Sequence, residues 1–174
     1  QLKVANGHVI IPNGVTRIRT ETFYDCKSLK SVEIPSSVQS IGDNAFWRCE
    51  SLTSIIIPRG VKNIGSGAFE HCESLESVTI PDSVTEIGED AFWGCNSLTN
   101  VRIDDGPQNL IIGDNAFTCC DSLISILLPS RVLSIGNEVF SFNTSLKKVI
   151  LMKGLRNIGK KAFHKCSSLC YINI

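Results

Sequence analysis

The sequence predicts a solenoid of stacked coils with a parallel β-sheet along one side, and three observations support this. A 23-residue pattern recurs from residue 11 onward: I-P-x-x-V-x-x-I-G-x-x-A-F-x-x-C-x-S-L-x-x-V-x. Each copy ends in the apolar–polar alternation that is typical of a strand. Each copy is also too short to bury its own apolar side, so neighbouring copies must cover one another.

Seven copies form a single predicted domain that spans residues 1–174. The copies begin at Ile11, Ile34, Ile57, Ile80, Ile103, Leu128 and Leu151. Ile174 opens an eighth copy, so we expect the chain to be a fragment of a longer array. Its open ends would need caps or could associate with a second copy of the chain. Residues 1–10 are expected to form an irregular coil or a short edge strand.

The strand lies at the end of each copy. Val101 and Ile103 should face the core, while Asn100 and Arg102 face outward. Because the copies run in one direction, their strands should form a parallel sheet with a spacing of about 4.8 Å. Pro81 and its equivalents lack a backbone donor and should end the strands. We expect this sheet on the concave face of a right-handed superhelix.

The remainder of each copy returns the chain around the core. Val84 and Ile87 are expected to point into the core on this path. Gly88 suits either a positive φ or a tight approach to the next coil. The segment 90–95 predicts one helical or 3₁₀ turn. One phenylalanine per copy should stack in a ladder through the core; the members are Phe23, Phe46, Phe69, Phe92, Phe117, Phe140 and Phe163.

The cysteines follow the repeat. Six of eight occupy one repeat position: Cys26, Cys49, Cys72, Cys95, Cys120 and Cys166. This spacing favours a ladder of reduced, buried thiols, although adjacent rungs lie within disulfide reach. Asn143 replaces the cysteine in the sixth copy and would need backbone partners, while Cys119 should point outward. His164 and Cys170 near Cys166 lack a second ligand pair, so we predict no metal site.

These motifs resemble one protein family. The I-P after the strand, the I-G and the A-F-x-x-C are similar to BspA-like (Treponema-type) leucine-rich repeats over residues 11–174. The resemblance implies a surface or secreted protein of a host-associated microbe, with repeats that bind host or microbial surfaces and no enzymatic activity. The position that carries a laddered Asn in commoner leucine-rich repeats differs here, so that account of coil stability does not carry over. Its occupants are Ser37, Gly60, Ser83, Gly106, Arg131 and Gly154.

The residues themselves also argue against catalysis. No nucleophile elbow, zinc-protease motif or phosphate-binding loop occurs. The only histidines, His8, His71 and His164, fall in different copies and cannot assemble one site. We therefore expect no enzyme activity and no cofactor. Nucleic-acid binding is disfavoured because no such motif is present, and no apolar run is long enough to span a membrane.

The outward strand positions form the first candidate binding surface. The outermost row is Glu33, Ile56, Thr79, Arg102, Leu127, Ile150 and Asn173, with Lys148 in the row beside it. Leu127 and Ile150 predict an apolar patch, which can mark a partner site or can be aliphatic filler on a sheet. Trp47 and Trp93 follow core phenylalanines on an outer edge, where they could contact a partner or pack against adjacent coils.

Charge is distributed unevenly, although 17 basic and 17 acidic residues cancel overall. No acidic residue follows Glu138, and that final stretch has seven basic residues, including Lys147, Lys148 and Lys153. It could attract sulfated glycans, acidic proteins or an anionic surface. Two alternatives are that further acidic repeats neutralise it, or that it is a solvated face without a partner. The fifth copy also has a two-residue insertion within 104–110, either a tolerated loop or part of a binding face.

We predict a non-catalytic module, on the cell surface or secreted, that binds a protein or glycan on a host or microbial surface. Extracellular-matrix proteins and sulfated glycans are the ligand classes considered. A spacer without a ligand and an intracellular interaction scaffold are the alternatives. The candidate contact residues are Ile56, Arg102, Leu127, Lys148, Ile150, Trp47, Trp93, Lys147 and Lys153.

Overall fold

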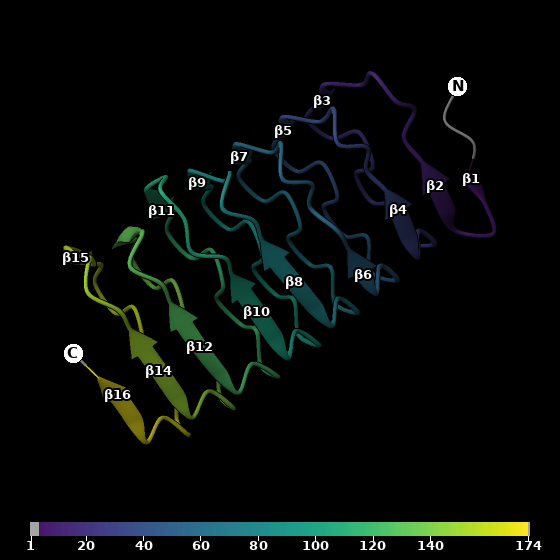
Figure 1. Ribbon diagram of the computed structural model, residues 1–174. Helices are drawn as coiled ribbons and strands as arrows, with labels where there is room; N and C mark the ends of the chain where they lie inside the picture. Colours follow the sequence, from purple (N-terminus) through teal and green to yellow (C-terminus); the bar gives the residue numbers. More distant parts are fainter. Residues whose placement is uncertain (1–3, 174) are drawn as a thin grey trace.

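The computed structural model describes residues 4–173 as a stack of coils with the two chain ends at opposite ends of the stack (Figure 1). The predicted opening of an eighth copy at Ile174 lies outside the described residues. Strands and turns build every coil, and residues 4–173 contain no helix. Accordingly, this part of the chain has no helix that could cross a membrane.

The predicted strands form the first sheet, and their parallel pairing is confirmed. Its strands are β2 (His8–Ile10), β4 (Ser31–Glu33), β6 (Ser54–Ile55), β8 (Ser77–Ile80), β10 (Asn100–Ile103), β12 (Ser125–Leu128), β14 (Lys148–Leu151) and β16 (Tyr171–Asn173). The hydrogen-bonded ladder is interrupted between β10 and β12, although these two strands remain adjacent. At the N-terminal edge, β1 (Val4–Ala5) pairs antiparallel with β2.

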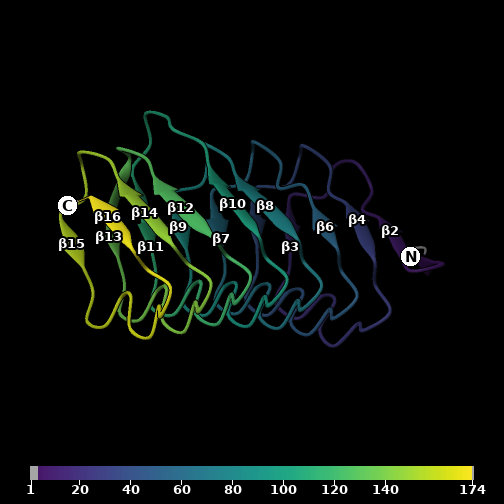
Figure 2. The same ribbon diagram turned by 90° about the horizontal axis from the view of Figure 1, so that it is seen from below.

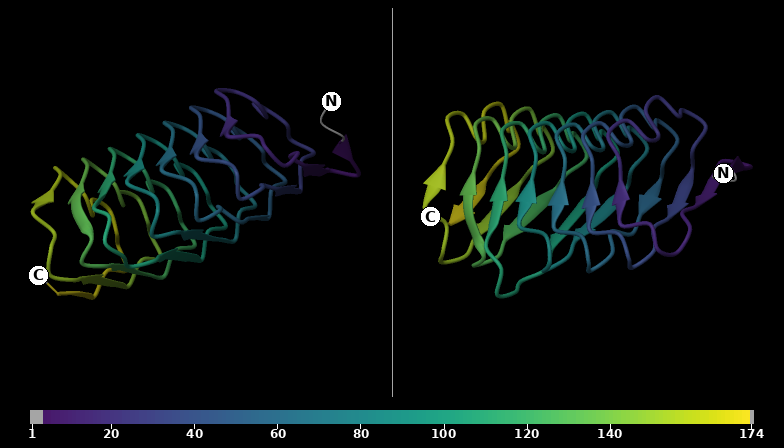
Figure 3. Two further views of the ribbon diagram at one scale, coloured as in Figure 1. Left: turned by 45° about the horizontal axis from the view of Figure 1, so that its top comes forward. Right: turned by 90° about the horizontal axis from the view of Figure 1, so that it is seen from above.

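A second parallel sheet runs along another side of every coil and was not predicted (Figures 2 and 3). Its strands are β3 (Arg17–Ile18), β5 (Ser40–Ile41), β7 (Asn63–Ile64), β9 (Glu86–Ile87), β11 (Leu110–Ile112), β13 (Val132–Ile135) and β15 (Asn157–Ile158). Most of these strands have two residues, of which one faces the core. Such a short segment shows no alternation, because a period of two needs several residues to be recognised.

The segment that follows the second sheet forms turns rather than a helical or 3₁₀ piece. The Trp93 N–H donates to the Asp90 carbonyl at 2.9 Å, and the Cys95 N–H donates to the Phe92 carbonyl at 3.3 Å. Asp90 (φ 56°) and Gly94 (φ 70°) adopt left-handed conformations, so the chain cannot continue as a right-handed helix. Backbone bonds to the next coil stabilise the turns, as between the Phe92 N–H and the Ala116 carbonyl at 2.8 Å.

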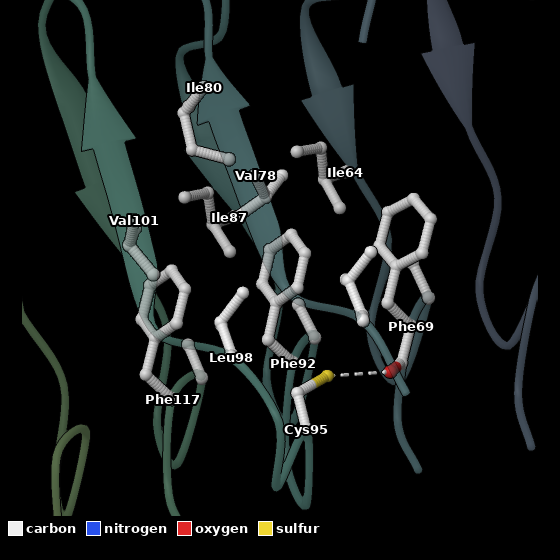
Figure 4. Packing of buried hydrophobic residues seen from close by; sticks show 14 of the residues in the cluster. Ile64, Phe69, Val78, Ile80, Ile87, Phe92, Cys95, Leu98, Val101 and Phe117 are labelled. Atoms are coloured by element: carbon white, nitrogen blue, oxygen red, sulfur yellow. Dashed lines mark hydrogen bonds between the residues drawn. The ribbon is translucent and has the colours of Figure 1, made fainter. Parts of the chain in front are cut away.

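The phenylalanine ladder is confirmed and fills the space between the sheets. Neighbouring rings are stacked, with centroids 5.0 to 5.7 Å apart along the ladder. Phe69, Phe92 and Phe117 are fully buried, and Ile87 and Leu98 lie beside the Phe92 and Phe117 rings (Figure 4). Removing an inner ring, as in Phe69→Ala, should cost about 3–5 kcal/mol because a cavity would remain between two coils.

The repeated cysteine also has a structural role. The Cys95 thiol donates to the Phe69 carbonyl of the preceding coil at 3.2 Å (Figure 4), and burial raises its pKa well above the ordinary value. All eight cysteines are free thiols, and Cys119 is partly exposed as predicted. Asn143 has the backbone partners that we expected. Its amide nitrogen donates to the Phe117 carbonyl at 3.0 Å, and its oxygen accepts the Cys120 N–H at 2.6 Å.

Gly88 is required by a tight approach between coils, not by a positive φ. A Cβ atom on Gly88 would lie 2.6 Å from the Ser66 backbone nitrogen and 2.7 Å from the Gly65 carbonyl carbon. The first coil has Arg19 at the equivalent position, and within residues 4–173 no coil precedes it. Glycine is therefore needed at this position in each coil whose preceding coil brings its backbone this close.

Candidate binding face

The predicted contact residues lie in separate parts of the molecule. Ile56, Arg102, Leu127, Lys148 and Ile150 share the outward face of the first sheet. The two tryptophans lie in the turns after the core phenylalanines. Lys147 immediately precedes β14, while Lys153 follows it. A single site cannot include all nine residues, and only the residues of the first sheet come together.

The outward row of the first sheet is exposed from Glu33 to Leu127, while Ile150 and Asn173 are half-buried. Ile56 is 82% exposed, and the Arg102 side chain is 71% exposed. Leu127 pairs in register with Ile150, and Ile124 nearby is exposed as well. The apolar patch is therefore present on the surface, while its use as a contact stays a prediction.

A depression of about 510 Å³ lies in this row between Ile56 and Arg102. Thr79 pairs with Arg102, and its short side chain leaves a gap between the two longer neighbours. Ile56 directly follows β6 and Arg102 belongs to β10, so the two residues lie two coils apart, which corresponds to roughly 10 Å at one strand spacing per coil. Ser54 and Ser77 also line the depression, and Arg59 contributes to its rim. This depression was not predicted from the sequence, although the long–short–long order of side chains in the row signals it.

Arg102 makes one ion pair at the edge of the depression. Its Nε atom donates to an Asp104 carboxylate oxygen at 2.8 Å. Among residues 4–173, the two terminal nitrogens of Arg102 make no hydrogen bond to the protein. The guanidinium therefore presents an unused pair of donors toward the solvent beside Thr79.

The insertion in the fifth copy follows β10, the strand that contains Arg102, and projects from the stack (Figures 2 and 3). Buried Arg131 anchors it by donating to the carbonyl oxygens of Asp104 at 2.6 Å, Val84 at 2.7 Å and Pro81 at 3.0 Å. Desolvation lowers the pKa of Arg131, and Asp82 and two aspartates of the insertion oppose this shift. The insertion is thus fixed at its base, while residues 107–109 at its tip are exposed.

The tryptophans pack against neighbouring coils. The Tyr24 and Trp47 rings are stacked with centroids 4.4 Å apart, and Arg48 lies over the Trp47 ring at 5.2 Å. The His71 ring lies edge-on between Trp47 and Trp93, at centroid distances of 6.5 Å and 4.6 Å. These contacts support packing as the main role of the aromatic edge, and a partner contact there stays a prediction.

Glu70 occupies the position that carries Trp47 and Trp93 in the neighbouring coils. Its side chain is 20% exposed. Desolvation raises the pKa of Glu70, and a hydrogen bond from the Trp47 side chain partly opposes this shift. The carboxylate is therefore less stable here than in water.

The basic C-terminal stretch is spread around the last coils. The Lys148 ammonium lies 5.4 Å from the centre of the Tyr171 ring. Lys161 pairs with Glu138 at 3.7 Å. Lys147 and Lys153 are exposed at opposite ends of β14 and have no ion pair within the described chain. A ligand of extended shape would be needed to reach both lysines.

No group of three or more His, Cys, Asp or Glu side chains in residues 4–173 is arranged to hold a metal ion. The depression between Ile56 and Arg102 is lined by guanidinium, carboxylate, hydroxyl and aliphatic side chains. Such groups can bind another molecule by hydrogen bonds, charge and apolar contact.

Comparison with known proteins supplies a family and several related structures. A family profile described as "BspA type Leucine rich repeat region (6 copies)" matches residues 6–110 and 62–174. A leucine-rich repeat protein of T. pallidum is 32% identical, with a TM-score of 0.81, over 94% of this chain and 78% of that one. No curated protein sequence matches the chain.

Two further solved structures are longer than this chain. A leucine-rich repeat protein of Bacteroides ovatus is 31% identical, with a TM-score of 0.67, over 94% of this chain and 47% of that one. The pneumococcal vaccine antigen PcpA is 21% identical, with a TM-score of 0.57, over 97% of this chain and 50% of that one. The chain thus spans about half the length of each of these two proteins.

Proposed function

The chain belongs to the BspA-type leucine-rich-repeat family, and from this premise we propose that it is a non-catalytic module that binds a protein ligand on the outward face of its first sheet. Proteins built from these repeats generally bind other proteins. The proposal further places the chain on the surface of a microbe or among its secreted proteins, with a ligand on a host or microbial surface.

One observation carries the proposal: the outward row changes in chemistry while the inward row does not. The inward residues are Val32, Ile55, Val78, Val101, Ile126, Val149 and Ile172, all valine or isoleucine. The outward row contains acidic, basic, hydroxyl, amide and aliphatic side chains in the same strands. Burial of the inward row stabilises the coils, and an isoleucine that is 82% exposed at residue 56 adds little to that core. The outward side chains of the first sheet are therefore available for contact with a partner.

A sulfated glycan is a second candidate ligand, because of the basic C-terminal stretch. Lys147 and Lys153 are exposed, and no acidic residue follows Glu138. Sulfate groups bind lysines chiefly through charge, so this binding should weaken steeply with salt.

The test is binding of the purified chain to immobilised extracellular-matrix proteins and to heparin, at low and at about 0.15 M salt. Protein binding that resists salt and is lost in the double variant Leu127→Ser and Ile150→Ser supports the first-sheet site. Heparin binding that is lost with salt and in the double variant Lys147→Gln and Lys153→Gln supports the basic stretch. Absence of binding to either ligand class would favour a spacer or an intracellular scaffold.

A further inference from the structure

We propose that the depression between Ile56 and Arg102 receives an acidic side chain of an extended protein segment, with an aliphatic side chain of that segment against Ile56. This inference rests on the proposed function and assigns a chemistry to its ligand. It identifies one region within the outward row of the first sheet, over β6, β8 and β10.

Charge is the first reason. The ionisable residues that line the depression are Arg59, Arg102 and Asp104, which leaves a net positive charge. Asp104 already accepts a hydrogen bond from the Arg102 Nε atom. The remaining nitrogens of a guanidinium form the fork that matches a carboxylate with two parallel hydrogen bonds. Arg59 supplies a second cation at the rim.

Preorganisation is the second reason. Arg131 is buried and donates to the carbonyl oxygen of Asp104, which fixes the backbone there. The carboxylate of the same aspartate holds Arg102 at 2.8 Å. A long arginine side chain normally loses rotamer freedom on binding. Because Asp104 already restrains Arg102, less of that entropy remains to be lost when a carboxylate arrives.

The shape and the other lining groups favour a protein segment over a sugar. Ser54, Ser77 and Thr79 offer hydroxyl groups that can donate to and accept from a peptide backbone. Ile56 offers an aliphatic surface at one side. No aromatic ring lines the depression in the described part of the chain, so a sugar lacks the flat face on which it would stack. The depression is open, which suits a segment that passes across the sheet.

The experiment uses two fluorescent hexapeptides as probes, one with alternating valine and glutamate and a matched form with glutamine. Fluorescence anisotropy measures their affinity for the chain, and NMR of Arg Nε–H and Ile methyl groups locates the contact. We expect binding of the glutamate peptide only, with signal changes at Ile56 and Arg102. Arg102→Gln should weaken this binding about tenfold or more, because a charge-assisted pair is lost. Arg17→Gln removes the same charge from the second sheet, where Arg17 is exposed on β3, and should change this binding less than about twofold.

Several results would overturn the inference. Equal binding of the two peptides would show that charge is not recognised, and unchanged binding in Arg102→Gln would remove the assigned contact. Signal changes at Arg102 with a heparin hexasaccharide but not with the peptide would assign the depression to a glycan. A matrix protein that binds the native chain and Arg102→Gln equally would leave the proposed function standing and refute the inference alone. Failure of every peptide and matrix protein to bind would refute both.

Discussion

Replacing Gly88 by alanine should force two coils apart, because the new Cβ atom would enter the backbone of the preceding coil. It would lie 2.6 Å from the Ser66 nitrogen and 2.7 Å from the Gly65 carbonyl carbon, where ordinary contacts are 3.4–4 Å. Relief requires a shift of most of an ångström. The Gly88 N–H donates to the Ile64 carbonyl at 2.8 Å, so the same shift weakens the ladder between β7 and β9.

The expected loss follows from two contributions. Overpacking of a close contact costs about 1–3 kcal/mol, and a weakened backbone hydrogen bond adds about 1 kcal/mol. Gly88→Ala should therefore lower the free energy of unfolding by about 2–4 kcal/mol. This is a large share of the roughly 5–15 kcal/mol that stabilises a folded domain.

Gly14 provides the matched control, because it needs glycine for a different reason. Its φ is 90°, and a Cβ atom there would meet nothing within 4 Å. Gly14→Ala thus introduces backbone strain without a clash and should cost about 1–2 kcal/mol. Comparing the two variants separates contact between coils from backbone conformation.

Guanidinium unfolding of both variants, followed by far-UV circular dichroism and by tryptophan fluorescence, measures the two costs. The two signals must give coincident transitions for a single free energy to apply, since repeat arrays can unfold in parts. If Gly88→Ala cost no more than Gly14→Ala, the coils would be able to separate freely at this point. The close-approach reasoning would then be wrong.

Three further predictions concern the core and its edges. Asn143→Cys should cost about 1 kcal/mol in guanidinium unfolding, because a thiol can bond to the Phe117 carbonyl as in other coils but cannot replace the oxygen that accepts the Cys120 N–H. Asn143→Leu should cost about 2 kcal/mol or more by leaving buried groups unpaired, and equal costs would contradict this. Glu70→Gln should raise the melting temperature at pH 7, because burial raises the pKa of Glu70 and charging it there opposes folding. Protonated Glu70 does not destabilise the folded protein, and this advantage is lost as the pH rises through the folded pKa. The gain from glutamine should therefore vanish below about pH 4, where Glu70 is protonated in the folded and unfolded states. A gain that persists there would refute this cause. In mass spectrometry, iodoacetamide should label exposed Cys170 in the folded protein and Cys72 only after unfolding, and early labelling of Cys72 would show that the ladder opens readily.

Features that repeat over many residues could be predicted from the sequence. The alternation at Val101 and Ile103 predicted the first sheet, and the regular phenylalanines predicted a stacked ladder. The polar Asn143 at a cysteine position predicted backbone partners, because a buried amide must be hydrogen-bonded. Each of these predictions depends on local periodicity or on burial, and both can be read along one chain.

The tertiary structure alone decided the features that depend on neighbouring coils. The second sheet has strands such as Glu86–Ile87 that are too short for a visible pattern, and only backbone pairing between coils forms it. The depression exists because Thr79 is short and the two residues flanking it, 23 positions before and after, are long. Periodicity thus determined which residues are buried in this chain, whereas side-chain lengths in neighbouring coils determined where its surface is hollowed.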